Sequence, residues 1–110
     1  MATDTPDYRS DGIVNHAYGK FTGAGVVVDV PLGFTPRIVR VINATDRISD
    51  EKFAGMAASE VLHTIAAGTR TLDTGSLITF KDPLVDLTRG FTIAAAAAIN
   101  AKVIYWEAIS

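Results

Sequence analysis

Short runs of β-branched and aromatic residues, separated by glycine, proline and polar turn residues, fill most of this chain. The clearest are residues 26–30, 37–43 and 103–108. Such residues favour extended strands, and the glycines and prolines between them mark turns. Turn signals at intervals of about eight to twelve residues are typical of a sandwich or barrel. The pattern predicts an all-β chain of about eight strands, folded as an antiparallel β-sandwich of the Greek-key or jelly-roll type.

Residues 1–12 differ from the rest of the chain, because they are polar and acidic. This composition predicts a flexible N-terminal arm, followed by a single β-sandwich domain over residues 13–110. At the start of that domain a glycine turn, Gly23-Ala24-Gly25, separates the runs 13–21 and 26–30. We expect two strands joined by this turn.

The run 37–43 carries apolar residues on both of its faces. A strand with one solvated face would alternate apolar and polar residues, whereas here Val39 and Val41 lie on one face and Ile38 and Ile42 on the other. This pattern suggests cover on both sides. We hypothesise that a second subunit supplies the second cover, and a monomeric mass in solution would contradict this.

In the final strand, alternation places Trp106 with Ile104 and Ala108, and Tyr105 with Glu107. We predict that Trp106 anchors the core and that Tyr105 faces outward, where an amphipathic ring is common at protein interfaces. Spacing alone leaves the reverse assignment open.

Several segments between these strands are less clear. Residues 50–68 fit both helical and strand periodicity, but Gly55 and the β-branched residues near the end of the segment favour two strands. Residues 69–72 and 76–80 predict a hairpin, and 84–87 a short bridge. The alanine run 94–98 allows one helical turn. It equally allows close approach of another backbone, which would make it a contact surface.

Composition and charge argue against several classes of function. Ten basic and twelve acidic residues give a net charge of −2, which leaves no basic excess for nucleic acid. The chain contains no cysteine, so it has no disulfide, thiolate ligand or redox centre, and assembly in a cytoplasm would suit it. Its apolar runs are far shorter than the roughly 20 residues of a membrane-spanning helix. We therefore expect a soluble protein with neither nucleic acid nor membrane as a partner.

Candidate catalytic and metal-binding residues are few. His16 and His63 show no metal-ligand spacing. Ser59, His63 and Asp50 could form a triad, but no nucleophile-elbow motif accompanies them. Three acidic residues between positions 46 and 51 could hold calcium, but the spacing and glycine of an EF-hand are absent, which favours a solvated turn. We predict no catalytic site, no cofactor and no metal.

Three blocks of sequence stand out by their order and spacing. They are GFTPRIVRVINATDR at 33–47, AAGTRTL at 66–72, and GFTI at 90–93 together with IYWEA at 104–108. These blocks resemble a family of small virion structural proteins of tailed bacteriophages, of the head decoration or cement type. The resemblance runs from about Gly33 to the C-terminus. The chain departs from the family in its alanine run and at 53–56, where relatives favour tryptophan first.

The resemblance implies a mechanical function without catalysis. Copies of the chain, with a homotrimer as the favoured count, would bind the outside of a capsid assembled in the host cytoplasm. There they would bridge neighbouring subunits of the major capsid protein and stabilise the shell against internal DNA pressure. Repeated modest contacts gain from multivalency on a lattice. The residues expected at the partner interface are Tyr8, Arg9, Arg37, Arg40 and Tyr105.

Three alternatives remain open. The least favoured is a small hydrolase, because the sequence shows no cluster of acid, base and nucleophile. The other two are binding proteins. A tail, neck or fibre component of the virion would share the fold and the lack of catalysis. A carbohydrate-binding β-sandwich module would need exposed aromatic side chains in a line or cleft, and the chain has one tryptophan, three tyrosines and five phenylalanines.

Overall fold

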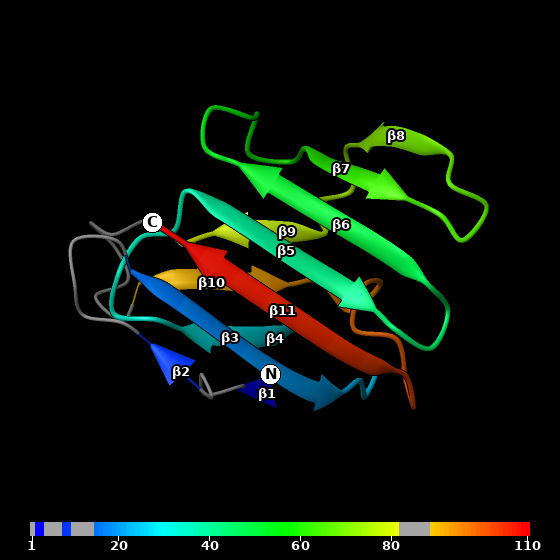
Figure 1. Cartoon of the computed structure of the whole chain (residues 1–110), viewed down its shortest axis with the longest axis horizontal. Helices are drawn as coiled ribbons and strands as arrows, with labels where there is room; N and C mark the ends of the chain where they lie inside the picture. The colour runs from blue at the N-terminus through cyan, green and yellow to red at the C-terminus, as the bar shows by residue number, and fades with distance from the viewer. Residues whose placement is uncertain (1, 4–7, 10–14, 82–88) are drawn as a thin grey trace.

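The computed structural model describes residues 2–3, 8–9, 15–81 and 89–110. Within these ranges the chain forms eleven strands in two facing sheets (Figure 1). The predicted all-β sandwich is therefore confirmed. The expected bridge at 84–87 and most of the expected arm 1–12 lie outside the described residues.

The larger sheet has seven strands and the smaller sheet has four. The larger sheet contains, in spatial order, β2 (Tyr8–Arg9), β3 (His16–Thr22), β11 (Val103–Ile109), β5 (Ile38–Asn43), β6 (Ile48–Phe53), β7 (Val61–Thr64) and β8 (Arg70–Asp73). The smaller sheet contains β1 (Ala2–Thr3), β4 (Val28–Pro31), β10 (Gly90–Ile93) and β9 (Ile78–Phe80). Neighbouring strands are antiparallel, except that β1 runs parallel to β4.

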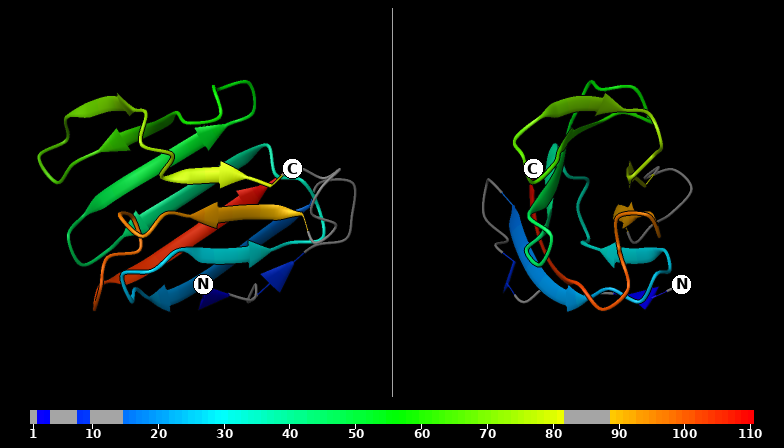
Figure 2. Two further views of the ribbon diagram at one scale, coloured as in Figure 1. Left: turned by 180° about the vertical axis from the view of Figure 1, so that it is seen from behind. Right: turned by 90° about the vertical axis from the view of Figure 1, so that its right-hand side faces the viewer.

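The chain passes repeatedly between the two sheets. Strands β3, β4 and β5 alternate between the sheets, and β6 to β8 continue from β5 as a meander. Strand β10 then pairs with β4, and β11 inserts between β3 and β5. In the edge-on view the larger sheet curves over toward the smaller sheet at its β7–β8 end (Figure 2).

The core lies between the sheets and is formed by the alternate residues that point inward. On β5 the inward residues include Val39 and Val41, and on β11 they include Trp106, which is 2% exposed. The Trp106 ring packs edge-on against Phe91 of β10, with ring centroids 5.5 Å apart. The prediction that Trp106 anchors the core is confirmed, as is the outward direction of Tyr105.

Two predicted turns prove to be crossings between sheets. The expected hairpin of 69–72 with 76–80 is wrong, because β8 pairs with β7 whereas β9 pairs with β10. In the connection between β8 and β9, the Ser76 N–H donates to the Ser59 carbonyl. The glycine turn after β3 also changes sheet. It lies so close to the 94–102 segment that a Cβ on Gly23 would stand 2.0 Å from the Ile99 carbonyl oxygen.

The two ambiguous segments are now resolved. Residues 50–68 contain the end of β6 and the whole of β7, so the choice of two strands is confirmed. The alanine run forms a single turn, in which the Ala98 N–H donates to the Ala94 carbonyl. Backbone of another segment also lies close to it, because the Gly25 N–H donates to the Ala98 carbonyl. Its role as a contact surface stays a prediction. The described residues include no helix with the length and hydropathy needed to cross a membrane.

Candidate functional site

The outer face of the larger sheet carries a shallow groove of about 240 Å³ over β3, β11 and β5. Three of its side chains are large, apolar or aromatic, and strongly exposed: Tyr18 at 46%, Ile42 at 43% and Tyr105 at 44%. Tyr105 and Ile42 are paired across β11 and β5. The groove is lined by Tyr18, Arg40, Ile42, Tyr105, Trp106 and Glu107. We call this set the outer groove.

A chain of charged side chains crosses the outer groove from strand to strand. Arg40 donates from Nη1 to Glu107 at 3.1 Å and from Nε to Glu51 at 3.3 Å. The other carboxylate oxygen of Glu107 lies 2.9 Å from His16 Nε2. The hydrogen bonds to Glu51 and then Glu107 raise the pKa of Arg40. The guanidinium is thus held in a fixed orientation between two carboxylates from neighbouring strands.

The structure brings together two of the five interface residues predicted from the sequence. Arg40 and Tyr105 both line the outer groove. Arg37 is exposed but stands outside it, just before β5, where its N–H donates to the Ile109 carbonyl. Tyr8 and Arg9 form β2, in which Tyr8 pairs with Tyr18 of the groove. Their side chains lie outside the described part of the structure.

Sequence reasoning missed Tyr18 and Ile42 as groove residues. Both alternate with buried neighbours, Ala17 and Val41, and that alternation was the available signal. What the sequence did not contain was the pairing of β3 with β11 and of β11 with β5. This pairing brings residues about 60 to 90 positions apart onto one surface, a separation that no local pattern records.

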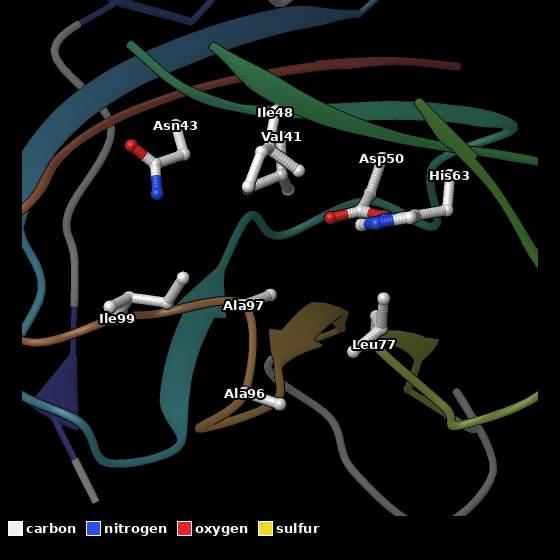
Figure 3. Close-up of a pocket in the computed structure, with 9 residues that line it drawn as sticks. All are labelled: Val41, Asn43, Ile48, Asp50, His63, Leu77, Ala96, Ala97 and Ile99. Atoms are coloured by element: carbon white, nitrogen blue, oxygen red, sulfur yellow. The ribbon is translucent and has the colours of Figure 1, made fainter. Parts of the chain in front are cut away.

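A second hollow lies inside the sandwich and has a volume of about 220 Å³. Asp50 of β6 and His63 of β7 form part of its wall, with Asp50 Oδ1 2.6 Å from His63 Nδ1 (Figure 3). Burial raises the pKa of Asp50, and the hydrogen bond to His63 opposes that rise. The cavity is lined by Val41, Asn43, Ile48, Asp50, His63, Leu77, Ala96, Ala97 and Ile99.

The structure also tests the catalytic triad and the calcium site that the sequence left possible. Within the described residues, Ser59 makes no hydrogen bond to His63, so two members of the possible triad meet and the third does not. Asp50 points inward and Glu51 outward on β6, while Asp46 bonds to Asn43, so the three acidic residues are dispersed. No cluster of histidine and acidic side chains suited to a metal ion occurs in the described ranges.

The fold and the outer groove define a class: a β-sandwich with an aromatic and charged surface on its larger sheet. Comparisons of the chain with protein-family models, with curated proteins and with solved structures found no match.

Proposed function

We propose that this protein is a non-enzymatic virion structural protein that decorates the capsid of a tailed bacteriophage. In this proposal copies of the chain, as homotrimers, bind the outer surface of the shell and bridge neighbouring subunits of the major capsid protein. The docking surface is the outer groove, with Tyr105 and Arg40 at its centre.

The observation that carries the proposal is the composition of the outer groove. Tyrosine and arginine are the residue types that most often dominate binding energy at protein interfaces. Here Tyr18 and Tyr105 share the outer groove with an arginine that Glu51 and Glu107 already hold in place, so little side-chain entropy is lost on docking. A surface of this kind suits a protein partner better than a small molecule, because it is shallow and open.

The sequence resemblance adds the class of partner. The block at 33–47 contains β5, and the segment IYWEA at 104–108 lies within β11; these are the adjacent central strands that carry Arg40 and Tyr105. The block GFTI forms β10, the strand of the smaller sheet that packs Phe91 against Trp106. The residues that resemble phage decoration proteins therefore include both the scaffold and part of the groove.

The first test is the number of copies of this chain in purified phage particles, measured by quantitative mass spectrometry against the major capsid protein. A ratio near one to one, or near a simple lattice fraction, supports capsid decoration. A handful to a few dozen copies per particle would instead indicate a component of the tail, neck or fibre. Absence from the particle would refute the virion proposal.

The second test locates the docking surface. Tyr105→Ser should weaken binding to expanded heads by about tenfold or more, because an exposed tyrosine at a hot spot is lost. Ile65→Ser is the matched control, since Ile65 is 42% exposed and lies in the turn between β7 and β8. Equal binding by both variants would refute the outer groove as the interface while leaving the virion assignment standing.

A carbohydrate-binding module is a second candidate, favoured by one specific observation. Tyr18 and Tyr105 lie on one groove with Arg40 and Glu107, and exposed rings beside charged hydrogen-bonding groups are suited to sugar rings and hydroxyls. A glycan array separates the two: specific glycan binding that Tyr105→Ser abolishes would favour this candidate. An array without signal would remove it.

A further inference from the structure

The cavity inside the sandwich has two chemically different walls. The wall from the larger sheet includes the polar pair Asp50 and His63, and the opposite wall, from residues 77 and 96–99, is apolar (Figure 3). Leu77 and Ala97 of the apolar wall are each 8% exposed, and Ala96 is exposed at the edge. The cavity is thus closed over most of its surface and reaches solvent beside the alanine turn.

Asp50 is the unusual member of the polar wall. It is 4% exposed, and its hydrogen bond within the described residues is the one to His63. An ionised carboxylate offers about four acceptor sites, so one donor leaves most of them unused. Figure 3 shows one carboxylate oxygen beside the His63 ring and the other directed away from it, into the space between the walls.

Lys52, two residues further along β6, shows what a purely structural buried charge looks like in this fold. It is 3% exposed, and its ammonium group donates to the carbonyls of Ala57, Ala58 and Glu60 at 2.7–3.2 Å. All three of its protons are used. Asp50, by contrast, keeps acceptor capacity and borders an open volume.

We propose that this cavity binds a small organic amine, with its ammonium group on the Asp50 carboxylate and its apolar part against Leu77, Ala97 and Ile99. The volume of about 220 Å³ sets the size of the ligand. A dry cavity of about 150 Å³ holds benzene in another protein, so this one has room for a phenyl ring and a short aminoalkyl chain. An organic anion is disfavoured because the negative charge of Asp50 would repel it. A hydrocarbon is disfavoured because it would leave that carboxylate without a hydrogen-bonding partner in the cavity.

The test is a titration of the ¹⁵N-labelled full chain with benzylamine, with toluene as the uncharged comparison, followed by NMR. Benzylamine should shift amide signals of β6, β7 and residues 94–99 with a saturable dissociation constant. Asp50→Asn should weaken benzylamine binding about tenfold to a hundredfold, since the acceptor loses its negative charge, and should not weaken toluene binding.

A second variant tests the cavity itself. Ala97→Leu places three additional carbons in the cavity and should abolish shifts by both ligands. Ala96→Leu, at the exposed edge, replaces it if Ala97→Leu does not fold. Benzylamine at about 20 mM would occupy most sites if its dissociation constant were millimolar. If it shifts no amide signal at that concentration, the proposal is overturned and the cavity is one that water fills. Equal benzylamine binding by Asp50→Asn would also overturn it. Asp50, Ala96 and Ala97 do not line the outer groove. If the amine proposal fails, the proposed capsid function is therefore unaffected.

Discussion

Replacing Gly19 by alanine should disturb Trp106, the side chain that anchors the core. Gly19 of β3 pairs with Trp106 of β11, and both are buried. A Cβ on Gly19 would lie 2.6 Å from Nε1 of Trp106 and 2.7 Å from its Cε2 and Cζ2 atoms, closer than real Cβ atoms approach heavy atoms. The indole cannot simply withdraw, because Phe91 packs against it at a centroid distance of 5.5 Å.

Two opposing effects determine the size of the change. Overpacking a filled core costs about 1–3 kcal/mol. Alanine in the interior of a strand gains about 0.5–1 kcal/mol over glycine, because the unfolded chain has less freedom to lose. The Gly19→Ala variant should therefore be less stable by up to about 2.5 kcal/mol, with about 1 kcal/mol near the middle of the range. A loss of about 1 kcal/mol lowers the melting temperature by about 4 °C for a chain of this size.

A double-mutant cycle with Trp106→Leu tests the cause directly. Leucine leaves room for the added methyl group, so Gly19→Ala should cost almost nothing, or even stabilise slightly, in that background. Unfolding in urea should be followed by far-UV circular dichroism, because Trp106 is the only tryptophan and its fluorescence is lost in the second background. An equal cost of Gly19→Ala with tryptophan and with leucine would refute the proposed clash.

Three further predictions concern charged residues. Lys52→Met should lower the free energy of unfolding by about 2 kcal/mol, because it removes an ammonium group that donates to three carbonyls; a variant as stable as the parent in urea would contradict this. Burial raises the pKa of Asp50 above 3.8 in the folded state, so the stability that Asp50 contributes is full below pH 3.8 and is lost as pH rises through the raised pKa. The stability difference between the parent and Asp50→Asn should accordingly fall as pH rises through that window, and a difference that grows would contradict the sign. Glu107→Gln should change stability in urea by less than about 1 kcal/mol, because the side chains of its ion pairs with His16 and Arg40 are 38–42% exposed and water screens them; a loss above about 3 kcal/mol would show that these pairs are structural.

The strands themselves were predictable because their signal is local. In the final strand, alternation placed Trp106 and Tyr105 on opposite faces, and the structure confirms both assignments. The same alternation in 37–43 put Val39 and Val41 on one face, which is the face the smaller sheet covers. β-Branched and aromatic residues at a period of two are enough to define a strand and its buried face.

The arrangement of the strands was not predictable, because pairing is not a local property. The segments that became β8 and β9 looked like a hairpin, since a turn between two apolar runs is compatible with either pairing or crossing. The burial of Asp50 and Lys52 was also not predictable from the sequence, because on β6 they occupy the inward face, where apolar residues are expected. Their hydrogen-bond partners are His63 and the carbonyls of residues 57–60, which come from other segments of the chain.

The hypothesis that a second subunit covers the strand 37–43 now concerns one defined surface. The inner face of β5 is covered by the smaller sheet, while Ile42 on the outer face remains 43% exposed beside Tyr105. The charges of the outer groove are already paired with one another, so docking there would leave no new unpaired charge. Removing these ion pairs from water still costs free energy, which offsets part of the gain from the two tyrosines. A surface with this balance favours modest affinity per copy, which is sufficient where many copies bind one lattice and insufficient for a single tight complex.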